Sequence, residues 1–389
     1  MSLPEKSYYD NKEVTEALSN LMVLLFQTVK LDSAKERAQR VLDLEKRFAS
    51  NNLTAAQLDE RWVIPEYWTQ KQFLRQFPII SEQVDLSSVP KKWSIHKYTP
   101  ELYKFTENAL KNENLETLKD YLIFRLVHYT LDFSNPEWEQ TYRKFRHQHL
   151  GFPAERRPLD EECTRLVQSE MGEELAAEMI LTVYKSYPRK EFTALVEKVR
   201  HSLLLGIKNN PWMESQSRSH ASAKIKNLRL GLLYPTKKED WRFPPEKTFS
   251  IEHYIQNRTL RQKALQERTF AELKKPRSLT AWSLTPMAFD AYYNRAENRF
   301  YFPVGFAMKP IYDPEKSELF NIASMGSLIG HELGHSLDKF GSQYNEFGAK
   351  RPLFTEKDQK KFEEFSQQFI KQFEHADHDG NLNFGRKHC

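Results

Sequence analysis

Apolar side chains recur at helical spacing over most of the first 275 residues. Leu115, Leu118, Leu122 and Leu126 give one such pattern, in a stretch without Gly or Pro. Only four of the 12 glycines precede residue 300, so this part of the chain is predicted to be dominated by helices. The predicted helices lie near residues 11–50, 114–150, 160–184, 190–208, 211–230 and 251–274.

The pattern changes after residue 280, where short aromatic runs replace the helical spacing. Residues 288–293 and 299–302 are two such runs on either side of a polar segment, which is typical of a β-hairpin. Residues 321–339 resume the helical spacing, and Gly341 is placed to close that helix. A further amphipathic helix is predicted over 354–373. The chain is therefore predicted to be mainly α with a small β-hairpin or sheet, an α+β protein.

Length, charge and cysteine content exclude several classes of protein. Against roughly 150 residues per domain, 389 residues predict two or three domains with ample core. Lys and Arg number 58 against 53 Asp and Glu, in no long block of like charge, so no nucleic-acid partner is expected. Two cysteines are too few for a disulfide framework or a Cys-rich zinc module. We expect neither a signal peptide nor a transmembrane segment, because the longest apolar run is short, at residues 21–26.

A His-Glu-Leu-Gly-His sequence at residues 331–335 carries the candidate chemistry. Helical residues four apart lie about 40° apart around the axis, so His331 and His335 can present both imidazoles to one ion. Glu332 can then reach a metal-bound water without binding the metal, as zinc hydrolysis requires. Asp338 lies one turn after His335 and is well placed to accept its second ring N–H. The pattern predicts one Zn²⁺ held by the two histidines.

The bare pattern is only suggestive, because a helix whose His and Glu merely pair with neighbouring side chains would look the same. The small and apolar residues 327–330 indicate a buried helix, in which unpaired His and Glu side chains would be costly. That favours the metal site. A zinc-protease class that needs a third His at the position of Gly341 and a Gly at that of Asp338 is excluded.

Four stretches resemble a known family: residues 211–213 (Pro-Trp-Met), 290–294 (Asp-Ala-Tyr-Tyr-Asn), 302–305 (Phe-Pro-Val-Gly) and 326–341. In order and spacing they resemble the neprilysin family of zinc endopeptidases of the gluzincin type, which includes the endothelin-converting enzymes. The resemblance extends over essentially the whole chain. It implies a two-lobed helical shell around a central cavity, with a thermolysin-like zincin catalytic lobe.

The resemblance also implies a division of the chain and a set of roles. Residues 1–250 would form a helical lobe that covers the active-site cavity. Residues 251–389 would form the N-terminal part of the catalytic lobe, incomplete at its C-terminus. His331 and His335 match the zinc ligands of the family, Glu332 its general base and Asp338 its carboxylate behind the second histidine.

Five residues match substrate-binding positions of the family: Asp290, Ala291, Phe306, Ile311 and Leu328. The first two match an Asn-Ala pair on an edge strand that clamps the substrate backbone. Asp290 is a departure, because an ionised Asp cannot donate a hydrogen bond, so that contact is either lost or replaced by attraction for a substrate amine. The other three are apolar, which implies a preference for a large hydrophobic residue just after the scissile bond, although ordinary core packing explains them equally well.

The third zinc ligand of the family is a Glu on a later helix, and we expect this chain to be truncated before it and at its beginning. His375, Asp377, His378 and Asp379 are expected to form a solvated turn and not a substitute site. His388 and Cys389 could bind metal, but residues this close to a chain end are usually mobile.

Two functions remain open on the sequence. The leading hypothesis is a zinc metalloendopeptidase that cleaves oligopeptides on the amino side of hydrophobic residues, with water activated by zinc and Glu332. The alternative is a truncated or degenerate homologue that binds peptide or metal without catalysis. Expected partners are oligopeptides and the segment of the same protein beyond Cys389, with the oligomeric state left open. The resemblance implies an extracellular, cell-surface or periplasmic location.

Overall fold

The computed structural model describes residues 1–54, 57–58, 61, 66–82, 86, 89–275, 278, 280–282 and 284–376. The chain forms two compact units, each built from two segments. Unit 1 comprises Met1–Glu161 and Glu246–Lys275, and unit 2 comprises Glu162–Pro245 and Pro276–Cys389. The chain thus leaves unit 1 after Glu161, returns to it for Glu246–Lys275 and leaves it again. The division expected at residue 250 stays a prediction. The roles expected for the two lobes stay predictions.

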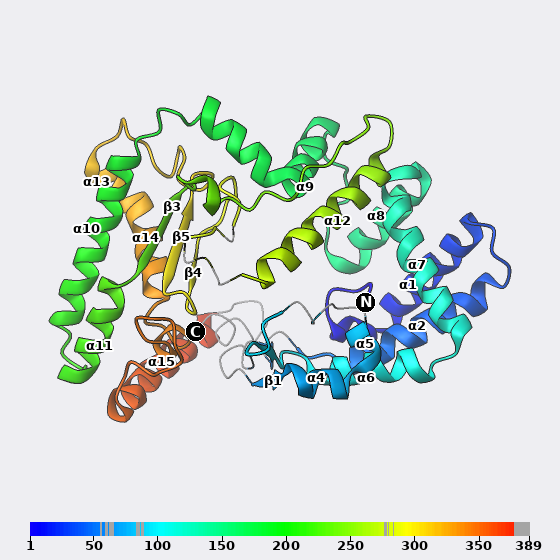
Figure 1. Ribbon diagram of the computed structural model, residues 1–389, viewed down its shortest axis with the longest axis horizontal. Coiled ribbons are helices and arrows are strands. Elements are labelled where there is room, and N and C mark those ends of the chain that lie inside the picture. The colour runs from blue at the N-terminus through cyan, green and yellow to red at the C-terminus, as the bar shows by residue number, and fades with distance from the viewer. Residues whose placement is uncertain are drawn as a thin grey trace. The chain divides into compact units, whose positions relative to one another are not determined.

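Unit 1 is helical, with one two-stranded antiparallel sheet (Figure 1). Its elements are η1 (Lys6–Asp10), α1 (Lys12–Thr28), α2 (Ala34–Ser50), β1 (Tyr67–Thr69), α4 (Gln70–Gln76), α5 (Pro78–Glu82), β2 (Ser94–His96), α6 (Pro100–Asn112), α7 (Leu115–Ser134), α8 (Pro136–Leu150) and α12 (Tyr254–Leu273). Its main core joins α1, α2, α7 and α8 through large apolar side chains such as Phe26, Phe124 and Trp138.

Two helices predicted as single are each a pair of helices. The range 11–50 breaks at residues 29–33, where Lys30 and Ser33 have φ of 56° and 54°. The range 114–150 breaks at Asn135, whose side chain accepts the Trp138 N–H and caps α8. Pro136 follows at the first position of α8, where its missing N–H costs nothing. Local backbone chemistry therefore overrides a continuous apolar pattern at both sites.

The leucine stripe that predicts α7 does not belong to the core. Leu115, Leu122 and Leu126 are 62%, 65% and 66% exposed, whereas Phe124 on the same helix is buried. A buried carboxylate instead ties α7 to α2, because Asp120 accepts hydrogen bonds from Arg37 and Arg40. The helix prediction is confirmed, and an ion cluster as well as apolar contacts holds it in place.

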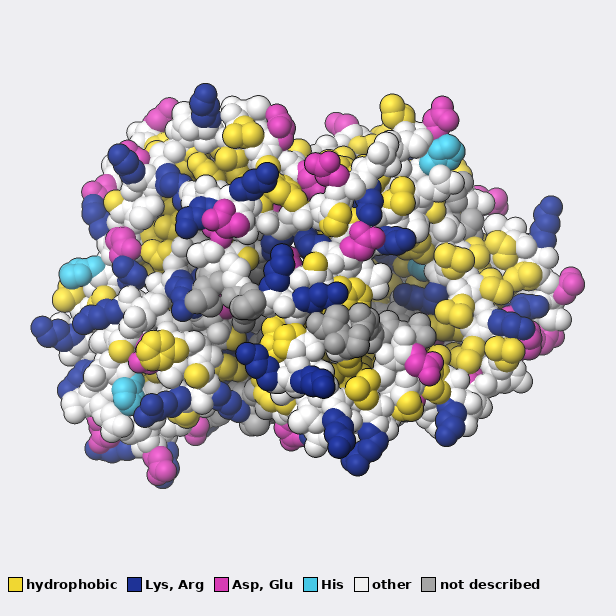
Figure 2. Space-filling model, in the orientation of Figure 1, with side chains coloured by type: hydrophobic (Ala, Val, Ile, Leu, Met, Phe, Trp, Pro, Cys, Tyr) yellow, Lys and Arg dark blue, Asp and Glu magenta, His cyan; other side chains and the backbone are white. Residues whose placement is uncertain are grey.

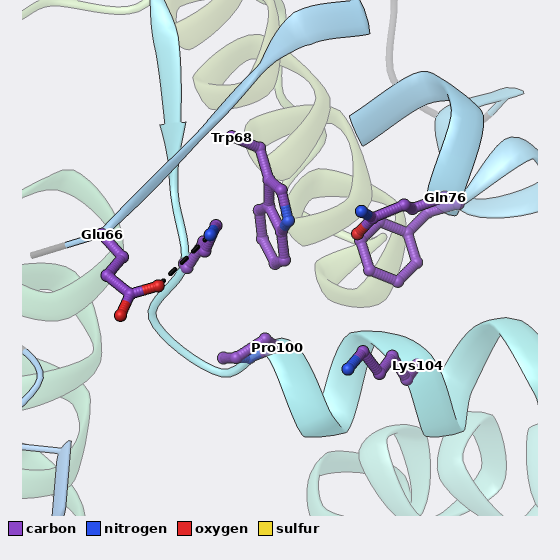
Figure 3. A pocket seen from close by; sticks show the side chains of 7 residues that line it. Glu66, Trp68, Gln76, Pro100 and Lys104 are labelled. Carbon is purple, nitrogen blue, oxygen red and sulfur yellow. Dashed lines mark hydrogen bonds and ion pairs between the residues drawn. The ribbon is translucent and has the colours of Figure 1, made fainter. Parts of the chain in front are cut away.

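A smaller aromatic cluster in unit 1 borders a cavity of about 450 Å³. Trp68, Phe73 and Phe77 are its buried members. Figure 3 shows Trp68, Gln76 and Lys104 around this cavity. Lys97 and Glu66 also line the cavity and form an ion pair at 3.2 Å. The pair lies at the surface, so its free energy contribution is small.

Unit 2 contains a three-stranded sheet flanked by helices (Figure 1). Its elements are α10 (Arg189–Lys208), α11 (Ser215–Lys226), β3 (Arg229–Leu233), η2 (Lys238–Asp240), β4 (Tyr292–Asn294), β5 (Arg299–Pro303), α13 (Glu318–Asn321), η3 (Ile322–Gly326), α14 (Ser327–Gly334), η4 (Gly341–Gln343) and α15 (Glu356–Ala376). One more helix, α9 (Leu159–Thr182), begins in unit 1 and continues into unit 2.

The predicted hairpin is confirmed as β4 and β5, paired antiparallel with Tyr292 opposite Tyr301. The strand β3 is a correction, because the predicted helix over 211–230 ends at Lys226. β3 pairs in parallel with β5, so the strand order is β3-β5-β4 and β4 lies at an edge. The run of apolar residues around Gly231, just before Pro235, is the local signal for this strand.

The main core of unit 2 lies between this sheet, α10 and α14. β5 is buried along its whole length, and Phe302 contacts Phe192 of α10 with ring centroids 5.5 Å apart. α14 contributes Ile329 and Leu333, which are fully buried in the same cluster. Each such side chain stabilises the unit by roughly 2 kcal/mol, so α14 is fixed firmly against the sheet.

The helix predicted over 321–339 ends earlier than expected. Its continuous part consists of α13, the π-helical turn η3 and α14, and it stops at Gly334. The chain then turns so sharply that a Cβ on Gly341 would lie 1.9 Å from the His335 carbonyl oxygen. Only glycine permits this approach, so Gly341 closes the turn after the helix and not the helix itself.

Charges are mixed over the surface of the protein. On the face shown in Figure 2, Lys and Arg side chains are interspersed with acidic and apolar ones. Among the described helices, none has both the length and the apolar content needed to cross a membrane.

Candidate metal and catalytic site

Three side chains of α14 converge at one point. His331, Glu332 and His335 each offer a ligand atom, and these atoms all lie within 4.8 Å of one another. The Nε2 atoms of the two histidines are 3.1 Å apart, and their rings meet edge to face. The convergence follows from the four-residue spacing on a helix, as the sequence predicts.

This donor set fits a tetrahedral metal ion. Zn–N distances of about 2.0–2.1 Å place two ligand nitrogens roughly 3.3 Å apart, close to the distance observed. The Nδ1 atom of His335 lies 2.8 Å from Asp338, so its Nε2 is free to present a lone pair. Within the part of the chain that the structure describes, no further His, Cys, Asp or Glu joins the three.

The helix itself is less buried than the sequence suggests. His331 is exposed and Glu332 is partly buried, while the apolar side chains of α14 point to the core. Of the glycines in and beside this helix, Gly330 lies against α10, where an added Cβ would meet Val199 at an ordinary 3.8 Å. The two histidines are thus accessible from the surface of unit 2.

Asp338 fixes the orientation of His335. Its Oδ2 pairs with the imidazole, and its Oδ1 accepts the N–H groups of Phe340 and Gly341 at 2.8 and 2.6 Å. Burial opposes ionisation of Asp338, but these hydrogen bonds hold its pKa below the usual value. The hydrogen bond to Asp338 in turn raises the pKa of His335. Its role behind a metal-binding histidine stays a prediction.

Lys224 holds the turn that follows Asp338, and the sequence prediction missed this residue. Its side chain is fully buried and donates to the carbonyl oxygens of Gly341 at 2.5 Å and Tyr344 at 2.6 Å. Burial lowers the pKa of Lys224 to about 7. A signal was present, because Lys224 lies on α11 three residues after the apolar Ala221 and next to the apolar Ile225.

The pKa of Glu332 is shifted toward neutrality, as expected of a group that transfers protons. Burial raises its pKa to about 7, His335 lowers it, and the negative charge of Asp290 raises it further. A carboxyl group that titrates near neutrality can both accept and return a proton. The geometry and the pKa of Glu332 are therefore suited to general acid–base chemistry.

A cavity of about 580 Å³ lies beside these residues, entirely within unit 2. The edge strand β4 and the residue before it form one wall, and the end of α14, the following turn and α15 form the others. Its lining residues are Ala291, Tyr292, Tyr293, Arg295, Glu332, His335, Asp338, Lys339, Phe340, Gly341, Phe362 and Ser366.

Of the five predicted substrate-binding residues, Ala291 lines this cavity. Asp290 is exposed, accepts the Ala291 N–H at 2.8 Å and is close enough to Glu332 to raise its pKa. Phe306 and Ile311 pack against the main core, Leu328 is partly buried, and none of these three lines the cavity. Their role as a specificity pocket stays a prediction.

The predicted turn around Asp377 and Asp379, and the candidate ligands His388 and Cys389, lie outside the described residues. No structural statement about them follows.

Comparison with known families gives a consistent match. Two family models, both described as Peptidase family M13, match residues 1–235 and residues 290–387. Together they account for most of the chain, and the second includes His331, Glu332 and His335.

Individual relatives are distant. The chain is 24% identical over 392 residues to "Endothelin-converting enzyme-like 1" of Rattus norvegicus, an alignment that covers 93% of this chain and 48% of that protein. It is 21% identical over 403 residues to "Endothelin-converting enzyme 1" of Mus musculus, covering 99% of this chain and 52% of the relative. The chain therefore spans about half the length of the curated relatives it matches.

Solved structures show the same fold. The Mycobacterium tuberculosis zinc metalloprotease Zmp1, in complex with an inhibitor, matches with a TM-score of 0.86 at 22% identity, over 98% of this chain and 59% of that one. PepO from Lactobacillus rhamnosis matches with a TM-score of 0.83 at 16% identity, over 97% and 61%. The predicted α+β class with a helical shell is thereby confirmed.

Proposed function

The chain belongs to peptidase family M13, and we propose that it carries the metal-binding half of a zinc endopeptidase site that hydrolyses oligopeptides. The observation that supports this most directly is the convergence of His331, Glu332 and His335 on a position beside a cavity walled by an edge strand. The activity proposed is that of a whole protein of this family, since the chain spans about half the length of its relatives.

His331 and His335 would hold the zinc ion, and Asp338 would keep His335 in the tautomer that binds metal. When bound there, zinc would polarise a peptide carbonyl and lower the pKa of a water molecule. The remaining steps belong to side chains of the chain itself.

Glu332 would take the proton from the attacking water and pass it to the leaving amine. Its partly buried carboxyl has a pKa of about 7, which suits both transfers near neutral pH. Because Glu332 is adjacent to His331 on α14, it reaches the same point without displacing a ligand.

The substrate backbone would add to the free edge of β4. An edge strand offers unpaired main-chain groups, and Ala291, Tyr292 and Tyr293 lie along the cavity wall. Asp290 at the start of this edge would favour a substrate amine. Cleavage on the amino side of hydrophobic residues, through Phe306, Ile311 and Leu328, is part of the proposal. An extracellular, cell-surface or periplasmic location and the segment beyond Cys389 as a partner are proposed on the resemblance alone.

The test is the Glu332→Gln variant in a peptide-cleavage assay, with zinc content measured in parallel. We expect bound zinc to be retained and cleavage to fall at least 100-fold, because only the proton transfers are lost. Glu364→Gln, an exposed glutamate on α15, is the matched control and should cleave like the parent.

Cleavage that persists in Glu332→Gln would refute the role of this residue. A parent chain that binds zinc yet cleaves no peptide would instead favour a homologue that binds without catalysis.

A further inference from the structure

Two cations of the cavity wall have no acidic partner. Arg295 and Lys339 both line the cavity that contains Glu332 and His335. Among the described residues neither forms an ion pair, and the buried Nη1 atom of Arg295 has no hydrogen-bond partner. Asp338, a carboxylate in the same wall, is already engaged by His335 and two backbone N–H groups.

The position of Arg295 is set by the fold. It directly follows β4 and begins the turn to β5, so it lies at the end of the edge strand that walls the cavity. Its guanidinium lies 5.2 Å from the centroid of the Phe340 ring, and Lys339 lies 5.7 Å from the same centroid. The two charges are therefore held on one aromatic ring beside the site.

An unpaired guanidinium that is partly withdrawn from water is costly unless an anion meets it. Its planar fork of donors matches the two oxygens of a carboxylate. Its charge also reaches the buried Lys224, whose pKa is lowered mainly by burial and further by Arg295.

We propose that Arg295, with Lys339 beside it, binds a carboxylate of a peptide that lies along β4. This inference rests on the proposed function only in naming the ligand as a peptide. The carboxylate belongs either to an Asp or Glu side chain or to a peptide C-terminus, because both offer the same two oxygens.

A purely structural role gives a different expectation. If Arg295 served only to pack on Phe340, its replacement would change the stability of the turn but not the preference between acidic and neutral ligands. Discrimination between matched ligands is therefore the decisive measurement.

The experiment uses the full chain without metal and measures binding by calorimetry, so that no turnover is needed. Three acetylated tripeptides serve as probes: Ala-Phe-Glu amide, Ala-Phe-Gln amide and Ala-Phe-Gln with a free carboxylate. At least one acid should bind about tenfold more tightly than the neutral amide, as expected for a charge-assisted pair. The acid that shows the preference identifies the source of the carboxylate.

In Arg295→Gln the preference should fall below about twofold, and Arg295→Lys should retain part of it because charge remains without the fork. Arg351→Gln, an exposed arginine outside the cavity, is the matched control and should keep the full preference. Thermal unfolding of each variant shows whether it is folded.

Equal binding of acids and amide by the parent chain, or no binding of either acid at millimolar concentration, would overturn the inference. So would a preference that survives in Arg295→Gln or disappears in Arg351→Gln. Discrimination between the tripeptides, together with peptide cleavage that persists in Glu332→Gln, would leave the inference standing and contradict the proposed function instead.

Discussion

Asp120 in unit 1 is fully buried and Asp338 in unit 2 is partly buried, and their hydrogen-bond partners differ in kind. Asp120 meets two arginines, which stay charged at every accessible pH. Asp338 meets an imidazole and two backbone N–H groups, and the other nitrogen of that imidazole faces a second histidine. A carboxylate whose oxygens are paired with arginines anchors one helix to another. A carboxylate paired with an imidazole instead orients that imidazole for metal binding. The partner, and not burial alone, decides which role an aspartate has.

Replacing Asp120 should give the largest effect on stability. Asp120→Asn leaves two arginines at the junction of α2 and α7 without their anion, so the free energy of unfolding should fall by about 3 kcal/mol. Urea unfolding followed by circular dichroism measures it. Asp43→Asn, an exposed aspartate on α2, should change stability by less than about 0.5 kcal/mol. A loss equally small for Asp120→Asn would show that the cluster is not an anchor.

Replacing Asp338 should change metal binding more than stability. In Asp338→Asn the amide no longer holds His335 in place as a carboxylate does, and zinc affinity should fall about 10- to 100-fold. Competition with a chelating dye measures it. Asp313→Asn, in the same unit but outside the cavity, should bind metal like the parent. Unchanged affinity in Asp338→Asn would remove the contrast with Asp120.

Lys224, which holds the turn after Asp338, makes the free energy of unfolding depend on pH. The unfolded chain keeps the Lys224 proton up to about pH 10.5, whereas the folded chain releases it near pH 7. Between these values the unfolded state binds more protons, so this residue makes stability rise with pH. Its neighbours Asp338 and Glu346 oppose the shift and Arg295 adds to it.

Lys224→Met should therefore lose this rise, and the stability difference between parent and variant should change in favour of the parent from pH 7 to pH 9.5. Urea unfolding at several pH values measures it. Lys226→Met, exposed on the same helix, should follow the parent. Parallel curves for the parent and Lys224→Met would show that Lys224 keeps an ordinary pKa.

The smallest effect is expected at the rim of the cavity in unit 1. The Glu66 side chain is 73% exposed in its pair with Lys97, so Glu66→Gln should change the free energy of unfolding by less than about 0.5 kcal/mol. The same urea titration measures it. A loss of more than 1 kcal/mol would mean that this surface pair resembles the buried Asp120 cluster.

The parts of the fold that could be predicted from sequence are those encoded locally. The four-residue spacing places His331 and His335 together, and the aromatic runs around a polar turn give β4 and β5. The break at Asn135 and Pro136 also has a local signal, a capping residue followed by a proline, although a single helix was predicted there.

Other features depend on contacts between distant segments. The left-handed conformations of Lys30 and Ser33 are a feature that the apolar spacing does not record, since no glycine marks them. β3 exists because β5, some seventy positions later, offers a parallel edge. Lys224 and Arg295 gain their importance only when the turn after α14 folds back on them, which no periodicity records.

The sharp turn at Gly341 determines how long a segment must be transferred to rebuild this metal site in another protein. A five-residue His-Glu-Leu-Gly-His graft on a foreign helix would reproduce the two imidazoles but leave His335 free to rotate. The graft would also need the chain through Tyr344, with glycine at 341, and a buried lysine from a second helix to hold that turn. A design that transfers this metal site should therefore include two helices and the turn, because the five-residue motif is only part of the structural unit.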